Sequence, residues 1–201
     1  NGVSFEVQKG EVMALIGESG SGKSVTLRAL MRLHPPGSSE LSGTLQVGDD
    51  EVLTMSASQL RRYRGGRCAM IFQEPLLAFD PVYTVGQQII EGLRRHEGLS
   101  RQAARDRALE ALSQVRIPSP ERRLDAYPHE MSGGMRQRAM IALALSCNPK
   151  LLLADEPTTA LDATVQIQIL ILLREQQKQR GLSIVFVTHD IGAAVEIADR
   201  V

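Results

Sequence analysis

Gly17-Glu18-Ser19-Gly20-Ser21-Gly22-Lys23-Ser24 is the stretch that decides the fold. It matches the pattern G-x-x-x-x-G-K-[ST] in full, and it lies between an apolar run, residues 12–16, and apolar positions at helical spacing within residues 27–31. Strand, loop and helix in this order predict a phosphate-binding loop, because the glycines let backbone N–H groups turn toward phosphate oxygens and the helix N-terminus adds partial positive charge. We expect Lys23 to reach the β- and γ-phosphates of a nucleotide and the Ser24 hydroxyl to ligate magnesium.

Two adjacent carboxylates follow another apolar run, residues 151–154. At the C-terminal edge of a strand beside the phosphate loop, Asp155 is suited to direct or indirect magnesium coordination. Glu156 can then point toward the γ-phosphate and polarise the attacking water. Alone, an apolar strand followed by Asp-Glu is more typical of a surface turn. Together with the phosphate loop it predicts a catalytic pair.

Short apolar runs typical of buried strands alternate with helical patterns along the chain. The runs are residues 12–16, 68–72, 151–154 and 184–187. This alternation predicts an α/β fold: a P-loop NTPase core with a mainly parallel sheet covered on both faces. A hairpin of residues 44–47 and 52–53 around Gly48-Asp49-Asp50 predicts a small antiparallel β portion.

Helical signals dominate between residues 76 and 148 and predict a helical insert. Thr84 with Gln87 marks one helix start, a second apolar stripe covers residues 104–115, and a third helix follows Ser132-Gly133-Gly134 to about Ser146. Outside the insert, a capping box at Ser56 and Gln59 predicts a short helix that ends near Arg64, and a further helix is expected over residues 163–179.

The composition is that of an ordinary globular domain. The 201 residues are 43% apolar and 23% charged, and 23 basic residues balance 23 acidic ones, so the net charge does not argue for a nucleic-acid partner. Arg61, Arg62, Arg64 and Arg67 form a local basic cluster, for which a solvated helix end is favoured over a phosphate patch. Cys68 and Cys147 lie in apolar stretches and are expected to be buried reduced thiols, and no apolar run approaches the ~20 residues of a membrane span.

A second glycine-rich helix start, Ser132-Gly133-Gly134, is by itself typical of an N-capped helix with a flexible entry rather than an anion site. Its place in the chain order changes that interpretation. The order is the phosphate loop, Gln73 after a strand, Ser132-Gly133-Gly134, Asp155-Glu156, Asp162 and His189. On these residues the chain resembles the nucleotide-binding domain of ABC transporters over essentially its full length.

The resemblance implies roles for the remaining motifs. Gln73 resembles the Q-loop glutamine, which touches magnesium and reports to the membrane subunit. Residues 131–138, Met-Ser-Gly-Gly-Met-Arg-Gln-Arg, resemble the LSGGQ signature, Ala160-Leu161-Asp162 resembles the D-loop, and His189 resembles the switch histidine that contacts the γ-phosphate.

One departure narrows the resemblance to a subfamily. Met135 stands where the widespread signature has glutamine, and Tyr127-Pro128-His129 comes just before it. These residues, together with Ala154–Asp162, are similar to importers of dipeptides, oligopeptides, glutathione and nickel. The resemblance therefore implies an ATPase that energises an importer of peptides or nickel.

The resemblance also implies how the chain is organised. Residues 1–201 would be a single nucleotide-binding domain, truncated at both ends, with an ATP-binding core over 1–75 and 149–201 and a helical subdomain over 76–148. The family stacks adenine on an aromatic residue well before the phosphate loop. Phe5, the sole aromatic in that region, is too close to the loop and fits a strand position, so the adenine platform is expected outside these residues.

The implied partners and cofactors follow from the family. ATP and Mg²⁺ would lie between the phosphate loop of one domain and Ser132, Gly133, Gly134 and Asp162 of a second domain, paired head to tail. Transmembrane permease subunits would be bound at the cytoplasmic face of the inner membrane, and an extracytoplasmic substrate-binding protein would be coupled indirectly, with no nucleic-acid partner. The alternative is a soluble ABC-type ATPase that acts on DNA or ribosomes.

Overall fold

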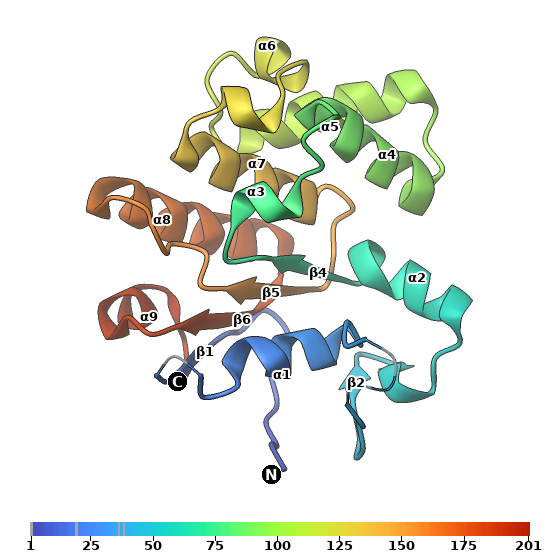
Figure 1. Ribbon diagram of the computed structural model, residues 1–201, viewed down its shortest axis with the longest axis vertical. Coiled ribbons are helices and arrows are strands. Elements are labelled where there is room, and N and C mark those ends of the chain that lie inside the picture. The colour runs from blue at the N-terminus through green and yellow to red at the C-terminus, as the bar shows by residue number, and fades with distance from the viewer. Residues whose placement is uncertain (1, 19, 36, 38) are drawn as a thin grey trace.

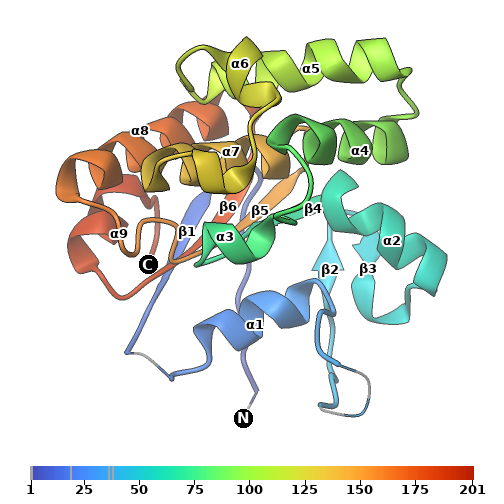
Figure 2. The same ribbon diagram turned by 45° about the horizontal axis from the view of Figure 1, so that its top comes forward.

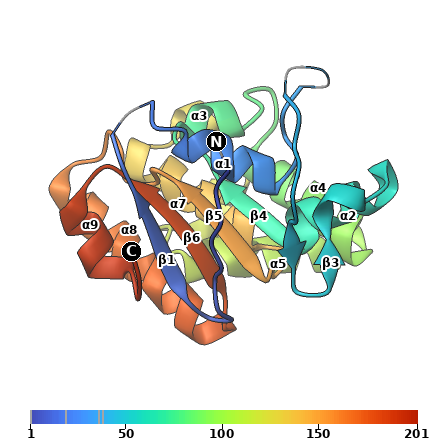
Figure 3. The same cartoon turned by 90° about the horizontal axis from the view of Figure 1, so that it is seen from below.

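The centre of the fold is a parallel sheet, described by a computed structural model that covers residues 2–18, 20–35, 37 and 39–201. Its strands are β1 (Val12–Ile16), β4 (Cys68–Ile71), β5 (Leu151–Asp155) and β6 (Ser183–Thr188), in the order β1-β6-β5-β4 (Figure 3). The prediction of buried strands at these four runs is confirmed. A parallel sheet covered on both faces gives continuous apolar runs rather than alternating ones.

The parallel register brings the C-terminal ends of the strands to one edge of the sheet. Ile16 pairs with Thr188, and Asp155 pairs with Val187 of the same neighbouring strand. On the far side of β5, Ile71 pairs with Ala154. The loops that follow β1, β4, β5 and β6 therefore start side by side, which is where ligands bind in open α/β sheets.

Helices cover the two faces of this sheet (Figures 1 and 2). They are α1 (Lys23–Leu30), α2 (Ala57–Gly66), α3 (Pro75–Ala78), α4 (Val85–Glu97), α5 (Arg101–Gln114), α6 (Pro120–Leu124), α7 (Gly133–Leu145), α8 (Ala163–Arg180) and α9 (Ile191–Ile197). Helices α7 and α8 lie on one face of the sheet, α1 lies on the other, and α4 to α6 form a further layer beyond α7 (Figure 2).

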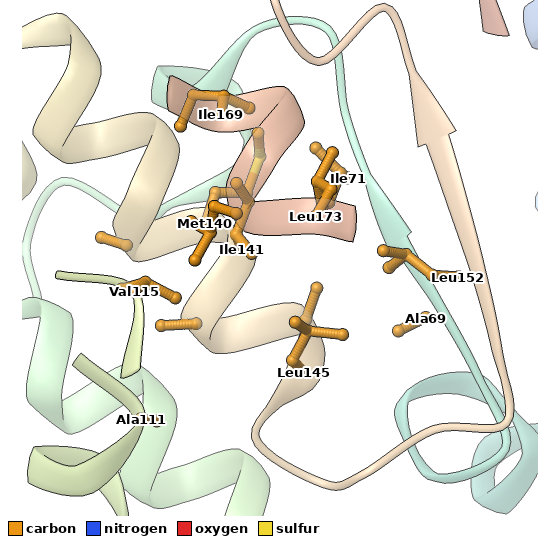
Figure 4. Close-up of a cluster of buried hydrophobic side chains, with 14 of the residues drawn as sticks. Ala69, Ile71, Ala111, Val115, Met140, Ile141, Leu145, Leu152, Ile169 and Leu173 are labelled. Carbon is orange, nitrogen blue, oxygen red and sulfur yellow. The ribbon is translucent and has the colours of Figure 1, made fainter. Parts of the chain in front are cut away.

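Successive side chains of the strands pack alternately into two hydrophobic clusters, one on each face of the sheet. Leu152 and Phe186 belong to a large cluster that includes the helices α4, α5, α7 and α8, whereas Leu153 and Val185 belong to a smaller one with Leu27 of α1. This division follows from the two-residue period of a strand. Figure 4 shows the large cluster where α7 and α8 pack onto β4 and β5.

The predicted helix starts are confirmed. Ser56 and Thr84 both form capping boxes with the residue three positions on, Gln59 and Gln87. The helices α3, α6 and α9 were not predicted, because they are short and the first two begin at prolines rather than at a capping signal.

The predicted hairpin exists, but its second strand is wrong. The pair is β2 (Gln46–Val47) and β3 (Asp50–Glu51), which lies beyond β4 (Figure 3), and residues Val52–Thr54 form a 3-10 turn instead of a strand. The Glu51 side chain accepts a hydrogen bond from the Leu53 N–H, and Val52 is fully buried. The cap and the burial together turn the chain away from the strand direction.

Two further expectations are corrected. The regular helical backbone of α2 ends near Arg64 as predicted, because Arg64 (ψ 120°) and Gly65 (φ 86°) are not helical. The Arg64 side chain, however, is not simply solvated: its guanidinium donates to the backbone oxygens of Met31, at 2.8 Å, and of Arg32. Phe5 does not lie on a strand, since no strand is formed within residues 2–8.

The two cysteines differ in burial. Cys68 is a free and buried thiol whose pKa burial raises to about 12, as expected, whereas Cys147 is free but only half-buried. None of the helices in the described part of the chain is long and apolar enough to cross a membrane.

Candidate functional site

The phosphate loop runs from the end of β1 to the start of α1. Gly20 and Gly22 have left-handed backbone angles, with φ of 83° and 95°, which an L side chain adopts only with strain. Gly22 is the N-cap of α1, and in the described residues no side chain caps this helix. The N–H groups of the first turn have no intrahelical acceptor, so this end of α1 can bind an anion. Ser19 lies outside the described residues.

Lys23 folds back over the loop that precedes it. Its ammonium donates to the backbone oxygens of Gly17 at 2.6 Å and Glu18 at 2.8 Å. The loop is closely packed at Gly17, where an added Cβ would lie 2.9 Å from the Ser21 Oγ and would require that hydroxyl to shift. The loop is therefore a tight turn with a cation held against it, an arrangement suited to a polyphosphate.

Ser24 and Asp155 meet although 131 positions separate them. The Ser24 hydroxyl donates to Oδ1 of Asp155 at 2.8 Å. Burial raises the pKa of the Asp155 carboxyl, while the hydrogen bond from Ser24 and the charges of Arg28 and Lys23 lower it. Asp155 is only 3% exposed, so it is a buried acid kept beside cations.

These oxygens fit a magnesium ion that also has phosphate ligands. Among the described residues, no group of three or more His, Cys, Asp or Glu side chains could hold a metal by itself. Mg²⁺ is commonly held by one or two carboxylates, with the remaining positions filled by water and substrate phosphates. The Ser24 hydroxyl and the Asp155 carboxylate supply that partial set.

Glu156 is the point at which the other predicted residues converge. Its Oε2 lies 3.1 Å from Nδ1 of His189 and 3.4 Å from Nε2 of Gln73. The Glu156 side chain is 14% exposed and that of His189 is 59% exposed. Gln73, predicted as a magnesium ligand with Ser24 and Asp155, is thus brought to Glu156, and within the described residues it makes no hydrogen bond to either of those two.

Sequence reasoning missed one member of this cluster. The Thr159 hydroxyl donates to the same Oε2 of Glu156 at 2.9 Å, the shortest of the three contacts. The sequence does hold an indication of this contact. Thr159 comes three residues after Glu156, and in a turn a Ser or Thr side chain can hydrogen-bond to a residue three positions earlier.

The second glycine-rich motif lies apart from this cluster. Ser132 is the N-cap of α7 and accepts a hydrogen bond from the Met135 N–H at 3.3 Å. In the described part of the chain, residues 132–134 make no hydrogen bond to the phosphate loop. Asp162 likewise caps α8, accepting from the Val165 N–H at 3.0 Å. The chain thus brings together Lys23, Ser24, Gln73, Asp155, Glu156 and His189, but not Ser132, Gly133, Gly134 and Asp162.

The sequence matches a known protein family over most of its length: the family model described as ABC transporter matches residues 1–159. The chain belongs to the ABC transporter family. It is 51% identical over 202 residues to the oligopeptide transport ATP-binding protein OppD of Bacillus subtilis, covering 100% of this chain and 56% of that protein. It is 50% identical over 198 residues to a putative peptide import ATP-binding protein of Brucella abortus, covering 98% of this chain and 60% of that one.

The chain is also similar to a glutathione import protein and to a solved ATP-binding cassette. The glutathione import ATP-binding protein GsiA of Escherichia coli K12 is 52% identical over 205 residues, covering 99% of this chain and 33% of that protein. A solved dimeric ATP-binding cassette in a post-hydrolysis state, bound to ADP and Pi, superposes with a TM-score of 0.83 at 30% identity, covering 96% of this chain and 80% of that one. The ABC ATPase fold is therefore confirmed, and this ABC transporter chain spans at most 60% of the length of these curated relatives.

Proposed function

We propose that this chain binds ATP with Mg²⁺ and hydrolyses it, as the ATP-binding domain of an importer of peptides, glutathione included. The observation that carries the proposal is the grouping of a phosphate loop, a Ser24–Asp155 oxygen pair and the Glu156 carboxylate at one edge of the sheet. The import of peptides is supported by the names of the relatives at about 50% identity.

Each part of the site has a role in this reaction. The α1 amides and Lys23 would bind the β- and γ-phosphates, and Ser24 and Asp155, together with Gln73, would hold magnesium. When bound, magnesium neutralises phosphate charge. Glu156 polarises the attacking water as a general base, and His189 contacts the γ-phosphate.

The direct test is the substitution Glu156→Gln, which keeps shape and removes the negative charge. ATP should still bind, while turnover falls by roughly 100-fold or more, because the water loses its base. Turnover by the complete protein and binding of a fluorescent ATP analogue would be measured, with the exposed Glu121→Gln as the control. Near-normal turnover of Glu156→Gln would remove Glu156 from this role.

The second proposal concerns the partner domain. The separation of Ser132–Gly134 and Asp162 from the chain's own phosphate loop supports a head-to-tail pair, in which these residues serve the ATP bound by the other copy. Gly133 is open, since no described heavy atom lies within 4 Å of a Cβ built there, which leaves room for a ligand from outside. The similar solved cassettes are dimers.

The third proposal concerns the permease. Two adjoining hollows of about 530 Å³ and about 220 Å³ lie along α2 and α4 and share Arg95. One acidic residue, Glu91, lines them, against five arginines that have no ion pair to any described residue: Arg61, Arg62, Arg94, Arg95 and Arg101. Charge complementarity favours an acidic segment of a permease, docked between the core (residues 1–75 and 149–201) and the helical subdomain (76–148).

Docking of this kind would hold the protein at the cytoplasmic face of the inner membrane and couple it indirectly to an extracytoplasmic binding protein. Replacing Arg61 and Arg95 together by Glu should weaken binding to the permease at least 10-fold and leave ATP binding unchanged. The control is Arg122→Glu on α6. Unaltered binding to the permease would place its docking surface elsewhere.

A further inference from the structure

Three side chains from three separate segments point at one oxygen of Glu156. Gln73 follows β4, Thr159 follows β5 and His189 follows β6, and all three lie within hydrogen-bond distance of Oε2. Within the described residues, Oε1 of Glu156 makes no hydrogen bond. One oxygen is therefore held, and the other is left for a water molecule.

The turn that carries Thr159 is fixed by its own backbone. Glu156 has a φ of 45° and Ala160 a φ of 63°, both in the left-handed region that non-glycine residues seldom adopt. The Glu156 N–H donates to Val187 O at 3.0 Å, and the Thr159 N–H closes the turn on Glu156 O at 3.2 Å. Backbone strain of this sort persists where the surrounding structure over-determines it, and here the turn keeps the Thr159 hydroxyl within hydrogen-bond distance of the Glu156 carboxylate.

The other two donors have competing roles in the proposed reaction. Gln73 would move to magnesium and His189 to the γ-phosphate, and both of these residues are exposed. Thr159 has no such second role, and within the described part of the chain its hydroxyl is hydrogen-bonded to Glu156 alone. It is the donor that stays when the other two leave.

We infer that Thr159 is a positioning residue for ATP hydrolysis: its hydroxyl holds Oε2 of Glu156 so that Oε1 is directed at the attacking water. This inference rests on the proposed function. A hydrogen bond to an ionised carboxylate is among the stronger ones in proteins, and misplacement of a general base affects turnover more than substrate binding. The effect should therefore appear in kcat and not in KM.

The test compares three substitutions in the complete protein. Thr159→Val keeps the shape and removes the hydroxyl, and we expect kcat to fall about 10-fold with KM for ATP within about twofold of normal. Thr159→Ser restores the hydroxyl and should recover most of kcat. Thr44→Val, at an exposed threonine remote from the site, is the control and should leave both constants unchanged.

A double-mutant cycle separates a positioning role from a structural one. In the Glu156→Gln background there is no carboxylate to position, so Thr159→Val should cause no further loss of turnover, whereas a structural defect would add to the first loss. Thermal unfolding of each variant is measured alongside, and Thr159→Ala replaces Thr159→Val if the latter does not fold.

Several further outcomes overturn the inference. Normal kcat in both Thr159→Val and Thr159→Ala, with turnover of Glu156→Gln collapsed, leaves the proposed function standing and removes Thr159 from it. Equal loss in Thr159→Val and Thr159→Ser shows a packing role. Absence of hydrolysis by the unaltered protein, or normal turnover in Glu156→Gln, overturns the proposed function itself and with it the role of Thr159.

Discussion

Two helices of this chain begin with a glycine-rich segment, and they begin differently. At α1 the N-cap is Gly22, in a left-handed conformation and without any described side chain to cap the helix. At α7 the N-cap is Ser132, which satisfies an N–H of its own helix. The first helix start leaves its amides to a ligand, whereas the second is already complete within its own chain.

The glycines of the two segments also differ in purpose. Gly22 is needed because its φ of 95° is one that an L side chain rarely adopts, and Gly134 because α7 passes close to α8, where an added Cβ would lie 3.0 Å from Cγ1 of Val165. Gly133, between Ser132 and Gly134, faces open space. Glycines at a helix start therefore leave the first-turn amides of α1 without a side-chain cap, let α7 pack closely on α8 at Gly134, and leave open surface at Gly133.

The largest effect is expected at the first helix start. Lys23→Ala removes the cation that the loop holds, so ATP turnover should fall by about 100-fold or more and ATP binding should weaken. Calorimetry with ATP and magnesium measures the binding, and Lys9→Ala, at an exposed lysine before β1, is the control. Unchanged binding would mean that the loop needs no cation to hold the phosphates.

The next test asks whether the start of α7, at Ser132, contacts the ATP bound by a second copy of the chain. A Ser132→Arg chain mixed with a Lys23→Ala chain should form heterodimers with one intact composite site, whereas each homodimer should be inactive. ATP turnover of the mixture should therefore exceed that of either parent, provided that one site suffices and heterodimers are shown to form. Turnover no higher than in either parent would contradict the head-to-tail arrangement.

A smaller effect separates the two glycines of the second segment. Gly134→Val pushes a branched side chain against Val165 and should lower the free energy of unfolding by about 1–3 kcal/mol. Gly133→Ala meets open space, so it should leave that free energy within about 0.5 kcal/mol of normal. Urea unfolding of the two variants makes the comparison, and equal destabilisation would show that Gly134 is not a packing residue.

The smallest effect is expected from removing the N-cap of α7. Ser132→Ala removes the acceptor for the Met135 N–H and should lower the free energy of unfolding by about 1 kcal/mol. Ser132→Asp, which can still cap, should restore it. If Ser132→Ala is as stable as the unaltered chain, the cap contributes nothing, and the two helix starts are more alike than their geometry indicates.

The sequence predicted most of the local structure, because the signals are local. The four strand runs, the capping boxes at Ser56 and Thr84 and the phosphate loop each depend on residues within a few positions of one another. The second strand of the hairpin was misplaced because the burial of Val52 and the cap from Glu51 outweighed its β-branched character.

The sequence by itself determined the phosphate loop, the family and the identity of the candidate site residues, since each is written in short motifs with a fixed order. Only the tertiary structure decided how those residues meet. It set Ser24 against Asp155, brought Gln73, Thr159 and His189 to one oxygen of Glu156, and turned Arg64 onto the backbone of the α1 C-terminus. The reason is physical: parallel strands place the ends of segments far apart in the chain at one edge of a sheet, and which side chains then touch depends on register and packing rather than on spacing.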